Sequence, residues 1–376
     1  MSLLPRLACV VLLFGGWQGS FGQATPVAAP VVASVPTAAS APAVAPAYAS
    51  NPKYTEAMSK GHLAMQHKDA DTAKGEFKKA DKIAGGQSSE SLEGLYQAEM
   101  RLGSYKDAAA TAVLLEGVVT TPWAKSSSET KHAQALLAQA GEKPKPAQLE
   151  AIEAALKAAI ANEPKNATAL FLDGEVLARL GKMDDAHTEF AQCVSCLSPR
   201  DPAMLRAKHF ADNPALSLQK MAPAFVVTAL DGTKFNLDAM GGRVVLIDFW
   251  ATWCGPCNEE LPHMKKIAKE FAGQPLVIIS VSWDSDEQKW KDFIAKNEMT
   301  WVQYRDADHV LTNQFGINAI PHYFTIDSDG VLTSEMLGEG SDVEGKLKKL
   351  VAKARAAQAS MTAANAVTTP GEHPGN

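Results

Sequence analysis

The sequence lacks a strong excess of charge of either sign. Its 376 residues include 42 acidic and 36 basic side chains, which give a net charge of −6 at neutral pH. Surfaces that bind nucleic acid usually carry a clear excess of Lys and Arg. We therefore expect no nucleic-acid partner. The length allows about two domains of ordinary size.

Cysteine is also scarce, with five in the whole chain. Cys9 lies near the N-terminus, and the other four form two Cys-x-x-Cys pairs, Cys193 with Cys196 and Cys254 with Cys257. A closed zinc site needs four ligands, and no second pair of Cys or His at zinc spacing lies near Cys193 and Cys196. We predict no metal and no cofactor.

The apolar run at the N-terminus is too short to cross a bilayer comfortably. It covers residues 7–16, follows Arg6 and precedes small residues, which is the pattern of a secretory signal peptide. We predict a signal peptide over residues 1–24, with an uncleaved anchor as the alternative. Most of the run lies after Cys9 instead of before it, which argues against a lipoprotein. We expect an exported protein, periplasmic or tethered to the membrane and facing the periplasm, where conditions are oxidising.

Two segments have too little apolar surface to form a core. Residues 25–52 consist mostly of Ala, Pro, Val, Ser and Thr. Their prolines favour an extended chain, so we predict a linker. Residues 357–376 are similarly small and polar, and we predict a disordered tail.

Residues 53–200 have a helical pattern that repeats about every 34 residues. The recurring small and apolar sets are Ala73/Phe77/Ala80, Ala108/Ala112/Leu115, Ile152/Leu156/Ala159 and Ala186/Phe190/Cys193. This pattern resembles the tetratricopeptide repeat (TPR), with copies predicted at 54–87, 89–122, 133–166 and 167–200. The third copy is the weakest, because a Gly-Glu-Lys-Pro-Lys-Pro segment interrupts its first helix. A generic helical bundle is the alternative.

Repeats of this kind present a concave face, so we expect a protein or peptide bound by them. Cys193 and Cys196 lie three residues apart, on one face of the last helix. The plainest interpretation is a small buried residue and its neighbour, with or without a structural disulfide between them. A second redox pair and half of a metal site are the alternatives. Residues 201–219 are predicted to be a connector with one short helix.

From about residue 220 the pattern changes to strands that alternate with helices. The strands expected are 244–250, 276–283, 301–304, 322–327 and 331–337, with an edge strand that begins at 222–225. The helices expected are 257–272, 286–297, 308–315 and 341–356. The last two strands flank a Ser-Asp-Gly turn and form a hairpin. We predict an α/β domain with a central mixed sheet over residues 220–356.

The centre of this domain is the segment 243–262, RVVLIDFWATWCGPCNEELP. It predicts a buried strand with one acid, Asp248, that delivers Cys254 and Cys257 to the start of a helix. The N–H groups and the positive dipole end of a helix stabilise a thiolate, and the thiolate is the nucleophile in disulfide exchange. An acid inside an apolar strand should have a raised pKa, which suits a general base. A solvated acid at the strand end is the alternative.

This segment resembles the active site of thioredoxin, and the wider pattern resembles the TlpA/ResA branch of the thioredoxin superfamily. The resemblance covers about residues 220–355. The motifs that carry it are an Ala-Pro-x-Phe opening at 222–225, an Asp-Gly turn at 231–232, Glu260 and Pro262 after the second cysteine, and Ile320-Pro321 before a strand. It implies a TPR-like helical repeat domain followed by a thioredoxin-like domain.

The resemblance also implies roles for the residues of the Cys-Gly-Pro-Cys motif. Cys254 would be the attacking thiolate and Cys257 the resolving thiol, and together they would form a redox disulfide. Gly255 and Pro256 would fix the turn and favour reducing behaviour. Asp248 would help to deprotonate Cys257.

Other residues are expected around this pair. Glu260 matches an acid that the branch places near the cysteines, unless it is an ordinary glutamate of a first helical turn. Pro321 is expected to be cis and, with Ile320 before it, to line the substrate path. Trp253 would shield the site. His322 either modulates the thiolate or points away from its strand.

We therefore predict an extracytoplasmic thiol-disulfide oxidoreductase that reduces protein disulfides. It would receive electrons from a membrane thiol donor and bind a partner through its repeats. An oxidase or isomerase of the same fold is one alternative, and an adaptor with an incidental redox domain is another. A peroxidase of the peroxiredoxin type would need a Pro-x-x-x-Thr-x-x-Cys site, which the chain lacks.

Overall fold

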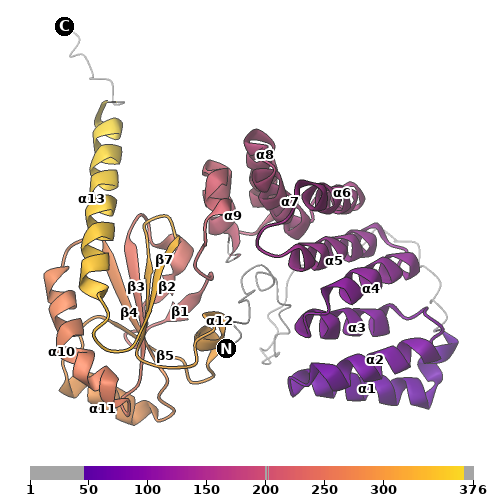
Figure 1. Ribbon diagram of the computed structural model, residues 1–376, viewed down its shortest axis with the longest axis horizontal. Helices are drawn as coiled ribbons and strands as arrows, with labels where there is room; N and C mark the ends of the chain where they lie inside the picture. Colours follow the sequence, from indigo (N-terminus) through magenta and orange to yellow (C-terminus); the bar gives the residue numbers. More distant parts are fainter. Residues whose placement is uncertain (1–45, 200, 202, 368–376) are drawn as a thin grey trace, which may run out of the picture. The chain divides into compact units, whose positions relative to one another are not determined.

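The computed structural model describes residues 46–199, 201 and 203–367 (Figure 1). The chain divides into two compact units, Met1–Ala169 and Leu170–Asn376, and the division lies inside helix α7. The predicted signal peptide and most of the predicted linker lie outside the described residues. The domain boundaries near residues 200 and 220 stay predictions.

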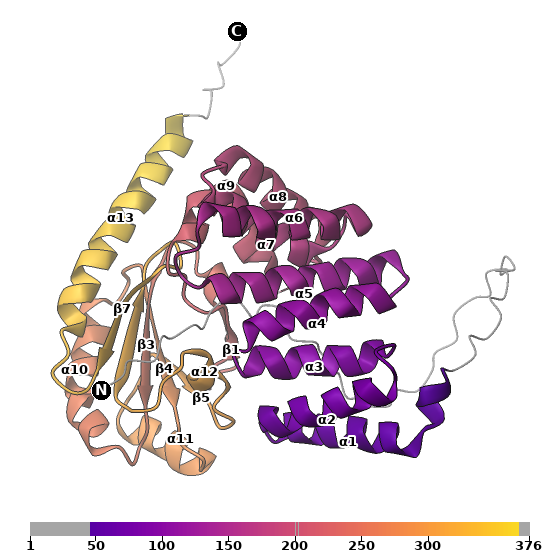
Figure 2. The same ribbon diagram turned by 45° about the vertical axis from the view of Figure 1, so that its right-hand side comes forward.

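The first unit is a stack of helices (Figures 1 and 2). Its elements are η1 (Ala47–Ser50), α1 (Pro52–Gln66), α2 (Ala70–Ile83), α3 (Ser89–Arg101), α4 (Tyr105–Val118), α5 (Pro122–Ala140) and α6 (Pro146–Asn162). Each α-helix packs against the next one in the chain. The pairs α1–α2, α3–α4 and α5–α6 have the arrangement expected of helical repeats.

The recurring positions explain how the first helices pack. Phe77 of α2 is buried, and a Cβ atom added to Gly61 of α1 or to Gly94 of α3 would lie 2.6 Å from its ring. Only glycine therefore allows both helices to approach Phe77 so closely. Ala73 and Ala80, on either side of Phe77 in the repeat, are fully buried. The other three recurring sets are also buried, as the repeat pattern predicts.

The third helix pair differs from the copy predicted at 133–166. The structure begins this pair at Pro122, the first residue of α5, where a proline suits the first helical turn. Helix α5 ends at Ala140, and the Gly-Glu-Lys-Pro-Lys segment connects it to α6. Gly141 has a positive φ of 72°, which ends α5. The predicted interruption is therefore the turn between the two helices of the pair.

The second unit begins with helices that pack through aromatic rings. Its first elements are α7 (Ala167–Arg179), α8 (Met183–Cys196), α9 (Ala203–Asp212) and η2 (Pro214–Leu218). The rings of Phe171, Phe190 and Phe210 lie 5.3 to 5.6 Å apart. A Cβ atom added to Gly174 would lie 2.7 Å from the Phe190 ring. This contact repeats the arrangement of glycine and phenylalanine around Phe77.

Helix α9 is held to the following fold by a buried ion pair. Arg206 donates through Nε and Nη2 to Asp238 Oδ1, at 3.0 and 2.8 Å. Asp238 lies in η3 (Leu237–Ala239), and both side chains are buried. Removing one partner of such a pair typically costs about 3–5 kcal/mol. The predicted connector 201–219 therefore contains a helix that is packed in place.

A five-stranded mixed sheet forms the centre of the second unit, in the order β5-β4-β3-β6-β7. Its strands are β3 (Val244–Trp250), β4 (Leu276–Ser282), β5 (Val302–Arg305), β6 (His322–Ile326) and β7 (Leu332–Leu337). Strands β3, β4 and β5 are parallel, whereas β6 is antiparallel to both β3 and β7. This mixed sheet confirms the predicted fold class.

The strand expected to begin at 222–225 is placed differently. It begins at Val226 as β1 (Val226–Thr228) and pairs with β2 (Lys234–Asn236) in a separate two-stranded sheet. The hairpin packs through Val227 against Phe249 and its neighbours on one face of the main sheet. Helix α12 (Val310–Gln314) covers the same face through Leu311.

The opposite face of the sheet is covered by three helices, α10 (Gly255–Glu270), α11 (Glu287–Lys296) and α13 (Val343–Val367). Helix α13 extends beyond residue 356, so residues 357–367 of the predicted disordered tail are helical. Alanine, the best helix former, is frequent in this stretch. Residues 368–376 lie outside the described part. Within the described ranges, no helix combines the length and apolar character needed to cross a membrane.

Candidate active site

Cys254 and Cys257 form a disulfide at the start of α10. Cys254 is the N-cap residue, and the backbone N–H of Cys257 donates to its Sγ at 3.2 Å. Pro256 lies in the first turn, where a missing N–H costs nothing. In the reduced protein the same N–H and the helix dipole would stabilise a Cys254 thiolate. The predicted delivery of the pair to a helix N-terminus is confirmed.

The disulfide is buried beside an exposed aromatic side chain. Cys254 and Cys257 are 6% and 7% exposed, whereas Trp253 is 65% exposed. The cysteines belong to an apolar cluster with Trp250, Ala251, Trp290, Ile294 and Met299, and Ile320 packs against this cluster. Ile320 therefore lies against the apolar cluster that contains the cysteines. Trp253 offers an aromatic contact surface at the edge of the site.

The Ile320–Pro321 peptide bond is cis, as predicted. The Pro321 carbonyl accepts a hydrogen bond from the backbone N–H of Gly338, at 3.0 Å. His322 follows in β6, with its Nε2 3.1 Å from a Glu335 oxygen and its ring stacked on Phe324. Side chains alternate between faces along a strand, so His322 points to the face opposite its neighbour Tyr323.

Asp248 is a buried acid in the middle of the sheet. Its side chain is 5% exposed, and its Oδ2 accepts a hydrogen bond of 2.8 Å from the Ser280 hydroxyl. Burial raises the pKa of Asp248 to about 7, the Ser280 hydrogen bond opposes this rise, and the nearby charge of Glu260 adds to it. The alternative of a solvated acid at the strand end is therefore wrong.

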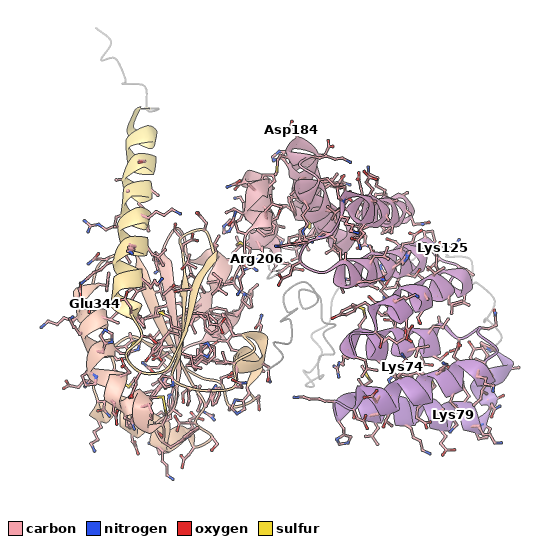
Figure 3. All side chains as sticks on the ribbon, viewed as in Figure 1. Lys74, Lys79, Lys125, Asp184, Arg206 and Glu344 are labelled. Atoms are coloured by element: carbon pink, nitrogen blue, oxygen red, sulfur yellow. A yellow bond between two sulfur atoms is a disulfide. The ribbon has the colours of Figure 1, made fainter. Side chains whose placement is uncertain are left out.

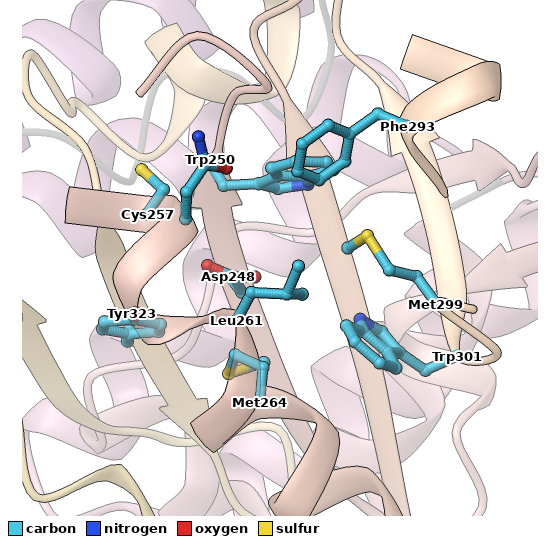
Figure 4. A pocket seen from close by; sticks show the side chains of 10 residues that line it. Asp248, Trp250, Cys257, Leu261, Met264, Phe293, Met299, Trp301 and Tyr323 are labelled. Carbon is cyan, nitrogen blue, oxygen red and sulfur yellow. The ribbon is translucent and has the colours of Figure 1, made fainter. Parts of the chain in front are cut away.

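Asp248 and Cys257 line the same small cavity (Figure 4). The cavity has room for about one water molecule, because the centre of a water can occupy about 10 Å³ of it. The remaining lining is Trp250, Asn258, Leu261, Met264, Phe293, Met299, Trp301 and Tyr323. Desolvation by burial, with the charge of Asp248, raises the pKa of Tyr323 far above its usual value. This cavity brings a titratable carboxyl and the second cysteine together.

Glu260 is partly buried and engaged on both carboxylate oxygens. Its Oε1 accepts a hydrogen bond of 2.7 Å from the backbone N–H of Gly340, and its Oε2 lies 3.1 Å from His263 Nδ1. Glu260 therefore ties α10 to the segment that follows β7. Its charge still reaches Asp248, whose pKa it raises. It differs from the exposed first-turn glutamate considered as the alternative.

A second buried acid, Asp284, was not predicted from the sequence. Its Oδ2 accepts from the backbone N–H of Thr252 at 3.0 Å, and its Oδ1 accepts from the Thr252 hydroxyl at 2.6 Å. The Ser282 hydroxyl donates to the same carboxylate at 2.6 Å. These bonds fix the chain two residues before Cys254. The signal was a Ser-x-Asp pattern at the carboxyl end of β4, which lies beside the end of β3.

The other Cys-x-x-Cys pair has a different environment. Cys193 and Cys196 are both thiols, at the carboxyl end of α8. Burial raises the pKa of Cys193 to about 12. The interpretation as a small buried residue is confirmed without a structural disulfide. Among the residues that the structure describes, no three His, Cys, Asp or Glu side chains are grouped to hold a metal ion.

The second unit is similar in sequence to known redox proteins. A family model described as Redoxin matches residues 218–351. Thiol-disulfide oxidoreductase ResA from Bacillus thuringiensis (strain Al Hakam) is 32% identical over 143 residues, which cover 38% of this chain and 83% of the relative. The chain belongs to the ResA-like thiol-disulfide oxidoreductases. It is therefore an enzyme of the thioredoxin superfamily, in its TlpA/ResA branch.

Two further proteins are similar to part of this chain. The thioredoxin-like protein YneN from Bacillus subtilis (strain 168) is 34% identical over 125 residues, which cover 32% of this chain and 71% of the relative. The solved thioredoxin domain of a thiol-disulfide oxidoreductase from Bacteroides vulgatus is 30% identical, with a TM-score of 0.32, and covers 35% of this chain and 97% of that one. The match to the Redoxin family begins at residue 218, after the helices α1 to α9.

Proposed function

We propose that this chain reduces disulfide bonds of exported proteins, with Cys254 as the attacking group. The observation that supports this best is the position of the Cys254–Cys257 disulfide at the start of α10, where the Cys257 N–H contacts Cys254 Sγ. A negative charge on Cys254 gains most from this position. Cys254 is also the residue adjacent to the exposed Trp253.

The first step is attack by the Cys254 thiolate on one sulfur of a substrate disulfide. A new S–S bond joins Cys254 to the substrate, the substrate S–S bond breaks, and the other substrate sulfur leaves as a thiolate that takes up a proton. Cys257 stays protonated during this step. The product is a mixed disulfide between enzyme and substrate.

The second step releases the substrate and requires a base. We propose that the Asp248 carboxylate takes the proton of Cys257, directly or through one water in their shared cavity. The Cys257 thiolate then attacks Cys254 Sγ, which forms the Cys254–Cys257 disulfide and expels the second substrate sulfur. Two electrons have passed from the enzyme dithiol to the substrate. A pKa of Asp248 near 7 suits a group that must both accept and return a proton at neutral pH.

The surroundings of the pair would guide the substrate. Trp253, Ile320 and Pro321 would border the bound strand next to the mixed disulfide, and Gly255 and Pro256 would hold the turn. The reverse reaction is oxidation of a dithiol. It uses the same groups, as does disulfide isomerisation, and the reduction potential of the cysteine pair decides which reaction is favoured. A reducing enzyme outside the cytoplasm needs a dithiol donor, for which a membrane thiol carrier is the proposal. The N-terminal pattern of residues 1–24 supports export.

We further propose that the helix pairs recruit the protein partner. They carry exposed large apolar side chains, of which Trp123 at 69% is the most exposed. Tryptophan is enriched among the residues that dominate protein interfaces. An adaptor with an incidental redox domain would keep its cellular role when both active-site cysteines are replaced, which separates the two functions.

The test is to trap mixed disulfides in cells with a Cys257→Ala variant of the full chain. Without the resolving thiol, substrates should remain attached to Cys254 and be identified by mass spectrometry. The matched control replaces both Cys254 and Cys257 by Ala and should trap nothing. If no partner is trapped and the parent chain does not reduce insulin disulfides, the proposal is wrong. Trp123→Ser should deplete the trapped partners without changing insulin reduction.

A further inference from the structure

A chain of two hydrogen bonds ends on the Asp248 carboxyl. The indole Nε1–H of Trp301 donates to the Ser280 hydroxyl oxygen at 2.8 Å, and the Ser280 hydroxyl donates to Asp248 Oδ2 at 2.8 Å. Ser280 faces Asp248 across the β3–β4 pairing, and Trp301 immediately precedes β5. These two hydrogen bonds thus connect the residue before β5, through β4, to β3 in the interior of the unit. Ser280 is fully buried.

The indole of Trp301 determines which atom donates and which accepts in both hydrogen bonds. An indole nitrogen only donates, so the Ser280 oxygen must accept from Trp301. The single hydroxyl hydrogen of Ser280 is then left to donate to Asp248 Oδ2. Since Ser280 is fully buried, bulk water does not compete for the hydroxyl. The Ser280 hydrogen is therefore directed at one acceptor, the Asp248 carboxyl.

We propose that Ser280 and Trp301 are positioning residues that hold Asp248 Oδ2 as a hydrogen-bond acceptor and leave Oδ1 to exchange a proton with Cys257. This inference rests on the proposed role of Asp248 as the base for Cys257. In this proposal Ser280 and Trp301 take no part in the sulfur chemistry themselves. They act through the orientation of the carboxyl and through the stability of its charged form.

The electrostatic consequence follows from the groups that face Asp248. Glu260 and Cys257 face it from α10, and Tyr323 faces it from β6. Burial and the Glu260 charge favour the protonated carboxyl, and the Ser280 hydrogen bond opposes them. A hydrogen bond to a charged group favours that charged form. Loss of the Ser280 hydroxyl should therefore keep Asp248 protonated to a higher pH.

A purely structural role predicts something else. Buried hydroxyl and indole groups normally find hydrogen-bond partners, whatever their function. Removing such a bond would lower stability but would leave the pH dependence of catalysis unchanged. The pH profile of the second chemical step is therefore the decisive measurement.

The experiment uses the full chain, reduced and mixed with a stoichiometric nitrobenzoate disulfide whose thiolate is coloured. The first thiolate released reports attack by Cys254, and the second reports attack by Cys257 on the mixed disulfide. The rates are measured across pH for the parent, Ser280→Ala, Trp301→Phe and Trp290→Phe. Trp290→Phe is the matched control, because the buried Trp290 Nε1 has no hydrogen-bond partner among the described residues.

For Ser280→Ala, the midpoint of the pH profile of the second release should rise by about one to two pH units. At a pH below this midpoint, the second release should be about ten- to a hundredfold slower than in the parent. Trp301→Phe should shift the midpoint in the same direction by less, because the freed hydroxyl can still donate to Asp248. Trp290→Phe should leave the midpoint unchanged. The first release should keep its pH dependence in all three variants.

The outcomes separate this inference from the proposed function. An unshifted midpoint in both Ser280→Ala and Trp301→Phe would overturn the inference, and a shift of equal size in Trp290→Phe would overturn it too. If Ser280→Ala does not fold, Trp301→Phe decides alone. A second release with an unchanged rate and pH profile in Asp248→Asn would instead refute Asp248 as the base, and the inference with it.

Discussion

The two Cys-x-x-Cys pairs share a spacing and differ in everything that governs reactivity. Cys193 lies where α8 ends, in an apolar environment that raises its pKa to about 12. Cys254 lies where α10 begins, and its sulfur accepts a hydrogen bond from a backbone N–H. The negative end of a helix dipole faces the first pair, and the positive end faces the second. Spacing alone therefore says little about redox function, and the position on the helix decides it.

The helix pairs of the first unit and the sheet of the second unit are also packed in different ways. The helix pairs of the first unit rely on glycine against phenylalanine, as at Gly61 and Phe77. The sheet of the second unit buries acids, Asp248 and Asp284, and surrounds them with hydroxyl donors. Apolar packing stabilises the fold but supplies no reactive group. Buried acids lower the stability of the fold and supply groups that can exchange protons. The following predictions test this contrast.

The largest effect is expected from removing the reactive thiol. Cys254→Ala should lower the rate of insulin disulfide reduction by at least ~10³-fold, because the nucleophile is lost. Cys193→Ala makes the same chemical change in the other pair and should leave the rate within about twofold of the parent, since the modest loss of stability typical of a single substitution leaves the protein folded. A comparable loss of activity in both variants would erase the contrast between the pairs.

The buried acid should make the folded protein less stable at higher pH. The pKa of Asp248 is about 7 in the folded protein, against an ordinary value of 3.8, so ionising it costs up to ~4 kcal/mol of stability. This cost is absent below about pH 4, grows as the pH rises toward about 7 and stays constant above. The oxidised Asp248→Asn variant should therefore be more stable than the parent at pH 8 and equally stable near pH 4.

Denaturant unfolding followed by tryptophan fluorescence checks this prediction. Five of the seven tryptophans lie in the thioredoxin-like domain, so the fluorescence reports mainly on the unfolding of that domain. They are Trp250, Trp253, Trp283, Trp290 and Trp301. A variant that is less stable than the parent at pH 8 would show that Asp248 is not held in a costly environment.

A smaller effect is expected in the helix pairs. Gly61→Ala would place a Cβ atom 2.6 Å from the Phe77 ring and should cost about 1–3 kcal/mol. Gly75→Ala in α2, where nothing lies within 4 Å, should instead stabilise the protein by about 0.5–1 kcal/mol. Thermal unfolding followed by circular dichroism measures both. Equal effects at the two glycines would contradict the close approach of α1 to Phe77.

The smallest effect is expected for alkylation of the buried thiol. With a pKa of about 12, Cys193 should be thiolate in only about one molecule in ten thousand at pH 8. Iodoacetamide should label reduced Cys254 within minutes and leave Cys193 unlabelled in the native protein, as measured by peptide mass spectrometry. Rapid labelling of Cys193 before unfolding would mean that it shares the reactivity of the other pair.

The sequence allowed most of the redox fold to be predicted, because its patterns are local. Strand 244–250 has the bounds expected, because an apolar run determines them. The helix after it was predicted over 257–272 and begins two residues earlier, at Gly255. The predicted start of the third helix pair was wrong. In the sequence, a proline-containing turn between two helices has the same pattern as an interruption within one helix. The helical extension of α13 was missed, since a small, Ala-rich composition suits both a helix and a tail.

The site was harder to predict than the fold. Cys254, Cys257 and Pro321 are recognisable from motifs, and the burial of Asp248 follows from its apolar neighbours. Asp284 could not be assigned, because its role depends on Thr252, 32 residues away in the chain. Ser280 and Trp301 are joined to Asp248 only when three strands lie side by side. A residue that acts through a partner far away in the sequence has no recognisable motif around it.

The ion pair between Arg206 and Asp238 (Figure 3 labels Arg206) determines where this chain can be divided and recombined. Similarity to the Redoxin family begins at residue 218, so a fragment cut at that boundary keeps Asp238 and discards its counter-charge. Such a fragment would leave the Asp238 carboxylate without its partner and would uncover the surface on which α9 packs, whereas one that begins ahead of α9 would keep both. A redox module moved onto another carrier, in the laboratory or by gene fusion, should therefore take α9 with it.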